Sequence, residues 1–179
     1  MKPLKQSPLK AKKSLTATKS LKSSRSLSAS TGKGSKQKKP SVSKLKKEAI
    51  KWFNRSIKYR DSELIEGEWL FICITCPRRV LFRDRDGKFN RSAHAGHFQP
   101  CHKENTRFND ENVNGQCGSC NYNQGEQYKY ARGLESKYGD GTADKLEKLA
   151  KVRKQWTVPE LEEIIKDSKH IVDFYEKLG

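Results

Sequence analysis

Residues 73–76 read Cys-Ile-Thr-Cys, and residues 117–120 read Cys-Gly-Ser-Cys. These two C-x-x-C pairs supply four thiolates, the number that fills a tetrahedral zinc site with Zn–S distances of about 2.3 Å. A single pair would also suit a redox site, whereas two pairs in a chain without an export signal favour a metal over disulfides. We therefore predict a structural Zn²⁺ held by Cys73, Cys76, Cys117 and Cys120. Metal binding would close the 40 residues between Cys76 and Cys117 into a loop.

The predicted loop contains side chains suited to hydrolytic chemistry. They are His94, His97, His102, Asn109, Asp110 and Asn112, and Asn121 directly follows the last cysteine. A neutral imidazole can take a proton from water near pH 7. Amide oxygens suit a hard cation such as Mg²⁺, which stabilises charge on a scissile phosphate and on the leaving oxygen. A single histidine is more often a surface residue, but enclosure between two zinc knuckles favours a site for phosphodiester chemistry.

The charge of the chain is divided unevenly along its length. The 179 residues contain 38 Lys and Arg against 21 Asp and Glu, a formal charge of +17. Residues 1–47 contain 14 Lys, one Arg and no acid, which leaves 23 basic and 21 acidic residues in 48–179. We therefore expect a disordered Lys/Ser-rich basic tail over residues 1–43 and one folded domain over 44–179. The composition of the tail favours a role in binding nucleic acid, in which its lysines neutralise phosphates. A solubilising arm and a nuclear localisation signal are the open alternatives.

Several classes of protein are excluded by these patterns. The sequence has no run of about 18 apolar residues, so a membrane span is not expected. The basic N-terminus lacks the apolar core of a signal peptide, so secretion is not indicated. We expect a cytoplasmic protein.

Local patterns predict helices and strands around the cysteine pairs. A helix is expected to begin near Ser43 and to end near Asp61, with an apolar stripe at helical spacing formed by Leu45, Ala49, Trp52, Phe53 and Ile57. Short apolar runs at 69–73 and 80–82 predict two strands that flank the first cysteine pair. Asp86-Gly87 predicts a tight turn after the second strand.

The C-terminal part reads as helical. A helix is expected to run from Asn121 toward Leu134 with a soft break at Gly125, followed by a short helix capped by Thr142. The second helix would contain Leu146, Leu149 and Val152. Thr157-Val-Pro-Glu is a capping box that opens a last helix. Its expected buried residues are Leu161, Ile164, Ile165, Ile171, Val172, Tyr175 and Leu178, and His170 is expected at its surface.

The motifs between the two cysteine pairs and around them resemble those of a known family. The motif residues are the first cysteine pair, Ala95-Gly96-His97-Phe98, and the run Arg107-Phe-Asn-Asp-Glu-Asn112-Val-Asn-Gly-Gln-Cys117-x-x-Cys120-Asn121. This pattern is similar to the HNH (ββα-metal) endonucleases and, more closely, to the lambdoid phage NinG/Rap recombination family. The resemblance covers roughly residues 46–178. It implies an α+β fold with a zinc-stabilised ββα-metal core and flanking N- and C-terminal helices.

The resemblance also implies roles for individual residues. His97 would be the general base that activates water, and Asn112 would brace the two ends of the motif. Asn121 would replace the final histidine of HNH as a ligand to catalytic Mg²⁺ or Mn²⁺. His94 stands where the family's Asp is expected, which would favour Mn²⁺ or another transition ion; Asp110 or Glu111 are alternative sources of the carboxylate.

The expected function is a metal-dependent, structure-selective DNA endonuclease that cuts Holliday junctions and other branched recombination intermediates. The alternatives are a general HNH endonuclease that also cuts duplex DNA, and a zinc-dependent DNA-binding protein without catalysis. Arg107, Lys129 and Arg132 are candidate phosphate contacts. A homodimer is expected because symmetric cleavage of a junction needs two active sites. Cys101 has no evident partner and is expected to be a free thiol.

Overall fold

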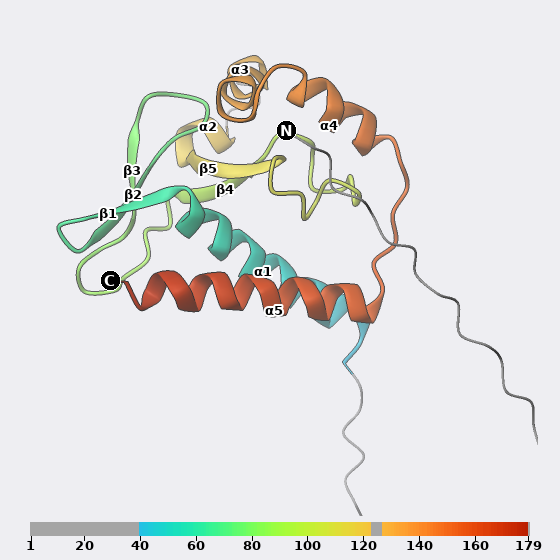
Figure 1. The fold of residues 1–179 in the computed structure, drawn as a ribbon, viewed down its shortest axis with the longest axis horizontal. Helices are drawn as coiled ribbons and strands as arrows, with labels where there is room; N and C mark the ends of the chain where they lie inside the picture. The colour runs from blue at the N-terminus through green and yellow to red at the C-terminus, as the bar shows by residue number, and fades with distance from the viewer. Residues whose placement is uncertain (1–39, 123–126, 179) are drawn as a thin grey trace, which may run out of the picture. The chain divides into compact units, whose positions relative to one another are not determined.

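The computed structural model describes residues 40–122 and 127–178, which form an α+β fold (Figure 1). The elements in chain order are α1 (Val42–Arg60), β1 (Ser62–Ile65), β2 (Glu68–Ile72), β3 (Arg79–Arg83), β4 (Ala93–His97), β5 (Val113–Cys117), α2 (Gly118–Tyr122), α3 (Gln127–Tyr138), α4 (Thr142–Ala150) and α5 (Val158–Glu176). Most of the predicted basic tail lies outside the described residues. None of the described helices is long and apolar enough to span a membrane.

The first sheet contains three antiparallel strands in the order β1-β2-β3. The β2–β3 connection contains Cys73 and Cys76, which confirms the prediction of two strands around the first pair. Strand β1 was not predicted. Glu66 and Gly67 both have positive φ (50° and 82°) and form the two-residue turn that joins β1 to β2.

The second sheet is the antiparallel hairpin of β4 and β5, in which His94 pairs with Gln116 and His97 pairs with Val113. The hairpin is joined by residues 98–112, hereafter the 98–112 loop. Helix α1 covers one face of the hairpin, because Phe53 and Ile57 pack with Val113 and Ala95. Helices α1 and α5 lie side by side (Figure 1) and share the buried residues Leu45, Ala49, Leu161 and Ile165. The predicted apolar stripe of α1 is therefore confirmed.

The capping box of α5 is confirmed, since the Glu160 carboxylate accepts hydrogen bonds from the backbone N and the Oγ1 of Thr157 (2.8 and 2.7 Å). The predicted buried face of α5 was too wide. Ile171 and Leu178 are 39% and 56% exposed. Only some of the apolar residues of α5 face α1, so the buried stripe of the helix is narrower than the sequence predicts.

Helix α4 differs from its prediction at both ends. Gly141, with φ 84°, is the N-cap, and Thr142 is the first helical residue, whose hydroxyl donates to the carbonyl of Gly139 (2.7 Å). Val152 lies beyond the helix and is 58% exposed, because α4 ends at Ala150. The expected soft break at Gly125 lies outside the described residues.

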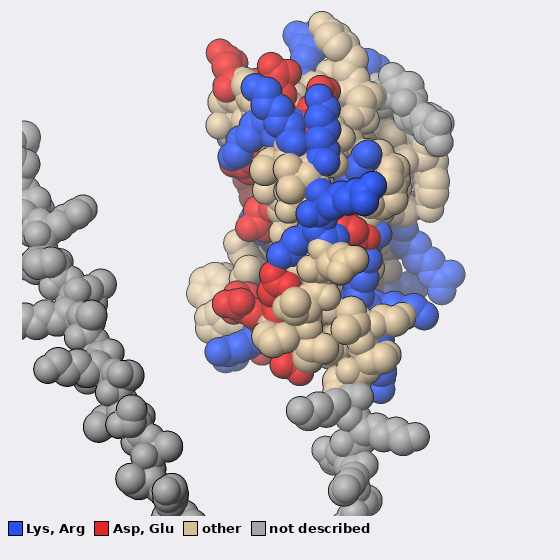
Figure 2. All heavy atoms as spheres, turned by 90° about the vertical axis from the view of Figure 1, so that its right-hand side faces the viewer, with Lys and Arg blue, Asp and Glu red and all other residues tan. Residues whose placement is uncertain are grey.

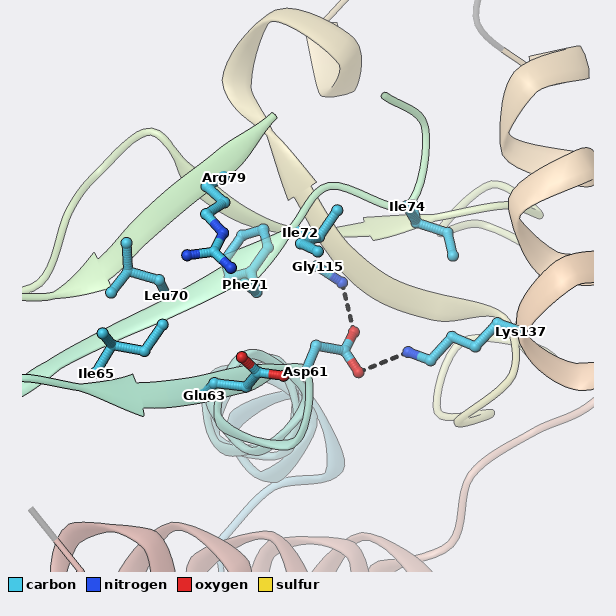
Figure 3. A pocket seen from close by; sticks show the side chains of 10 residues that line it. All are labelled: Asp61, Glu63, Ile65, Leu70, Phe71, Ile72, Ile74, Arg79, Gly115 and Lys137. Atoms are coloured by element: carbon cyan, nitrogen blue, oxygen red, sulfur yellow. Dashed lines mark hydrogen bonds and ion pairs between the residues drawn. The ribbon is translucent and has the colours of Figure 1, made fainter. Parts of the chain in front are cut away.

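Asp61, the C-cap of α1, joins three elements of the fold. Its side chain is 6% exposed, and it accepts hydrogen bonds from Arg60, from Lys137 of α3 (2.7 Å) and from the backbone N of Gly115 in β5 (2.7 Å). Figure 3 shows the last two contacts at the edge of a cavity of about 190 Å³ between β1, β2 and β5. Asp61 therefore ties α1 and α3 to the strand that ends at Cys117.

The charge of Asp61 should contribute strongly to stability. Burial disfavours the carboxylate, but Arg60 and Lys137 outweigh burial and hold the pKa of Asp61 below its usual value. We predict that Asp61→Asn lowers the free energy of unfolding by about 1.5–3 kcal/mol, because a buried carboxylate that accepts from half-buried Arg60, exposed Lys137 and the backbone N of Gly115 becomes a neutral amide. Urea unfolding at pH 7, followed by circular dichroism, measures the loss.

The pH dependence provides the second half of this test. Because the folded pKa is lowered, the contribution of Asp61 is fully present above about pH 4 and is lost as pH falls through the folded pKa. The difference between wild type and Asp61→Asn should therefore shrink below about pH 4. Asp140→Asn, at an exposed position, is the matched control. Equal stability of the Asp61 and Asp140 variants at pH 7 would contradict the role of this network.

Candidate metal centre and the adjoining histidine loop

The four cysteines predicted as zinc ligands meet at one point in the structure. Cys73 and Cys76 come from the β2–β3 connection, Cys117 ends β5, and Cys120 lies in α2. Their four Sγ atoms lie within 4.8 Å of one another. Cys76 Sγ and Cys117 Sγ are 3.9 Å apart, close to the roughly 3.8 Å edge of a tetrahedron with Zn–S bonds of about 2.3 Å. The cluster can hold a metal ion such as zinc, as the sequence predicts.

Hydrogen bonds around the cluster join the two sheets. The backbone N of Ile74 donates to the carbonyl of Gly115 (3.0 Å), and the backbone N of Cys117 donates to Cys73 Sγ (3.4 Å). The buried Gln116 amide donates to Thr75 Oγ1 (2.7 Å). Backbone N–H groups pointed at sulfur are suited to thiolates, which carry negative charge.

Helix α3 packs tightly against the first knuckle. A Cβ atom at Gly133 would lie 2.2 Å from the carbonyl oxygen of Ile74, so only glycine permits this approach. Lys129 and Arg132, two of the predicted phosphate contacts, line a hollow of about 430 Å³ beside Cys76. They therefore lie at the metal centre, whereas Arg107, the third predicted contact, lies in the 98–112 loop.

His97 ends β4 and enters the 98–112 loop. Burial disfavours the imidazolium and lowers the pKa of His97, an effect that hydrogen bonding to the backbone of Arg107 and Ala95 opposes and the guanidinium of Arg107 reinforces. The ring is therefore neutral at pH 7 and has a nitrogen lone pair that can accept a proton. A permanent cation, Arg107, stands beside this base.

Asn112 fastens the two ends of the same loop. It is fully buried, its Oδ1 accepts from the backbone N of Gln99 (2.7 Å), and its Nδ2 donates to the carbonyls of Thr106 (2.9 Å) and Gln99 (3.3 Å). Its own carbonyl accepts from the backbone N of Phe98 (2.9 Å). Both ends of the amide are hydrogen-bonded to the loop and the side chain is fully buried, so Asn112 has the bracing geometry.

His94 and Asn121 lie at the other end of the hairpin. The His94 ring meets Tyr122 of α2 edge-on, with ring centroids 5.1 Å apart, and Asn121 is the exposed neighbour of that tyrosine. Burial and the charge of Lys58 lower the pKa of His94. A neutral imidazole is the form that binds a metal.

Strand alternation separates His94 from His97. Residues three apart in a strand point to opposite faces. His97 shares its face with Ala95 and Val113, which pack on α1, whereas His94 shares its face with Gln116. The structure thus brings His97 together with Arg107, and His94 together with α2. Among the described residues, only the four cysteines form a cluster of His, Cys, Asp or Glu close enough to share an ion.

Asp110 and Glu111, the alternative carboxylates, lie at the His97 end of the hairpin and have partners of their own. Glu111 is paired with Lys145 of α4 (2.7 Å), and Asp110 lies 3.8 Å from Arg60. Neither reaches the end at which His94 pairs with Gln116. Cys101 is exposed and free, as expected.

The roles of two residues in this region were not predicted. The Asn109 side chain accepts from the backbone N of Glu111 and of Asn112 (2.9 and 3.0 Å) and so shapes the turn before β5. Buried Tyr130 of α3 donates to the carbonyl of Gly96 (2.8 Å). The Asn-Asp-Glu-Asn run is typical of an Asx turn, so the role of Asn109 could have been predicted from the sequence. The hydrogen bond of Tyr130 joins distant parts of the chain, and no local pattern predicts it.

Loss of one cysteine ligand should release the metal and loosen the fold. We predict that Cys120→Ser lowers zinc content from one ion per chain to near zero. Thermal stability should fall as well, because the free energy of metal binding contributes to the free energy of folding. Cys101→Ser is the matched control and should retain both zinc and stability. Zinc is measured by atomic emission on the purified protein. Full zinc retention by Cys120→Ser would contradict a four-thiolate site.

Comparison with known proteins supports the predicted resemblance. The chain matches the family described as "Bacteriophage Lambda NinG protein" over residues 2–177, nearly its whole length. No curated protein matches it, and no solved structure does. The chain therefore belongs to the NinG family of bacteriophage proteins.

Proposed function

We propose that this chain is a metal-dependent DNA endonuclease of the HNH (ββα-metal) type that acts on branched recombination intermediates such as Holliday junctions. The single observation that carries the proposal is the loop enclosed by the cysteine cluster, which holds a neutral His97 beside Arg107. Strand β4, the 98–112 loop, β5 and α2 follow one another in the order of a ββα unit.

The proposed chemistry assigns a separate task to each residue. His97 takes a proton from the attacking water, since its ring is neutral. Arg107 stabilises negative charge on the phosphate. Asn112 positions the loop from which both act, through its bonds to Gln99 and Thr106. His94 and Asn121 are the proposed holders of Mg²⁺ or Mn²⁺, which when bound would stabilise charge on a phosphate oxygen.

One observation favours a second candidate, a zinc-dependent DNA-binding protein without catalysis. His94 and His97 lie on opposite faces of the hairpin, so a cation held by His94 and Asn121 would not touch the His97 ring in this arrangement. The second candidate needs only the cysteine cluster and a basic surface. It predicts junction binding without a metal-dependent product.

Selectivity for branched over duplex DNA and the homodimer remain predictions. The homodimer has a candidate surface on α5, where Ile171 and Phe174 are exposed beside a hollow of about 540 Å³ lined by Ile57 and Tyr138.

Replacement of the proposed base is the decisive experiment. We predict that the zinc-loaded full-length protein nicks a four-way junction in Mg²⁺ or Mn²⁺, and that His97→Ala slows nicking by about 100-fold or more, the usual contribution of a general base. Junction binding, measured by gel shift, should be unchanged. Initial rates on labelled junction and on matched linear duplex also separate selective from general cleavage.

His102→Ala is the matched control, because His102 is an exposed histidine of the same loop. Its rate should equal that of wild type. The rate of wild type should fall only below about pH 6.5, because the pKa of His97 is lowered from that value. If His97→Ala nicked the junction at the wild-type rate, the assignment of His97 as the general base would be wrong. If wild type gave no product in either metal, the non-catalytic DNA-binding candidate would be favoured.

A further inference from the structure

A strip of exposed cations lies at the end of α4 and on the segment that joins it to α5. Its members are Lys148, Lys151 and Arg153, hereafter the α4–α5 strip. All three are exposed, and their side chains make no hydrogen bond or ion pair with another residue of 40–122 or 127–178. Figure 2 shows Lys and Arg gathered over the middle of the face that carries this connection.

The strip is fastened to the 98–112 loop at three points. Asn105 Nδ2 donates to the carbonyl of Leu149 at the end of α4 (3.0 Å). Lys145 of α4 pairs with Glu111 (2.7 Å). Beyond the strip, Trp156 meets Phe108 edge-on, with ring centroids 5.1 Å apart.

These contacts fix the strip relative to the proposed base. Phe108 follows Arg107, the cation beside His97, and Asn105 precedes Thr106, the acceptor of the Asn112 amide. A polyanion that lies on the strip is therefore held in a defined register to the loop. A flexible basic surface would not impose such a register.

The composition of the strip suits a phosphodiester backbone. Three cations that have no partner among the described residues lie within six positions of the sequence, so phosphates would compete there with water alone. Gln155 is exposed next to them and can donate to a phosphate or a sugar oxygen. Val152, 58% exposed, offers apolar contact to a deoxyribose.

The neighbouring hollow extends this surface toward the start of α1. It has a volume of about 350 Å³ and is lined by Val42, Lys46, Glu104, Lys154, Gln155 and Trp156. Lys46 and Lys154 are each paired with an acid, Glu104 and Glu160, so they add less attraction than the strip.

We propose that Lys148, Lys151 and Arg153 form a nucleic-acid contact that holds the phosphate backbone of one DNA arm on the α4–α5 connection, in register with the 98–112 loop. This surface is separate from the predicted contacts Lys129 and Arg132 at the metal centre. The inference rests on the proposed function and deepens it by locating part of the substrate. Binding can be measured without catalysis, so its failure and that of the nuclease proposal are distinguishable.

The test compares two triple variants of the full-length protein in a His97→Ala background without added Mg²⁺ or Mn²⁺. The first variant is K148Q/K151Q/R153Q. The second, K88Q/R91Q/K177Q, removes the same charge from positions on the β3–β4 connection and at the end of α5. Both variants should melt at the wild-type temperature. Fluorescence anisotropy with a labelled four-way junction and with a labelled duplex gives Kd over a salt series.

The strip variant should raise Kd about tenfold at low salt. It should also reduce the slope of log Kd against log salt by about 2–3, since each phosphate that a cation neutralises contributes about 0.9 to that slope. The matched variant should change the slope by less than about 1. Equal slopes for the two variants would overturn the proposal, because net charge alone would then explain binding. Displacement of DNA by polyglutamate of equal charge, as efficient as by unlabelled DNA, would instead show an acidic-peptide site and would also overturn it.

Discussion

The convergence of four cysteine thiols is the constraint on which the rest of the structure depends. Cys73 and Cys76 belong to the three-stranded sheet, whereas Cys117 and Cys120 belong to the hairpin and the helix that follows it. Burial raises the pKa of Cys73 and of Cys120, so bringing these thiols together favours their protonated forms unless a cation replaces the protons. A metal ion such as zinc, held by the four thiolates, would replace these protons and connect the two sheets.

The loop between the cysteine pairs is held by hydrogen bonds at its ends and along its length. Its ends are joined by Asn112, and its outer turn is fastened to α4 through Asn105. On the inside of the fold, Asp61 ties β5 to α1 and α3. His97, at the end of β4, and Arg107, in the 98–112 loop, therefore lie where the chain is held by contacts from several elements. That arrangement suits a site that must hold a base and a phosphate contact at fixed separation.

The sequence predicted much of this fold because its strongest signals are local. The thiol spacing, the stripe of α1 and the Thr157 capping box each depend on a few adjacent residues, and all are confirmed. Strand β1 was missed because its turn uses Glu66, a residue not typical of positive φ. The exposure of Ile171 depends on which elements cover α5, and periodicity contains no such information. The separation of His94 from His97 follows from strand alternation once β4 is known to include both.

Hydrogen–deuterium exchange with and without bound metal tests whether the four-cysteine junction holds the 98–112 loop in place. Zinc-loaded protein is compared with protein from which zinc has been chelated. After chelation, we expect the amides of Phe98, Gln99 and Asn112, all hydrogen-bonded inside or across the loop, to lose protection together with those of the cysteine knuckles. Loss of protection confined to residues 73–76 and 117–120, with the loop amides unchanged, would contradict it.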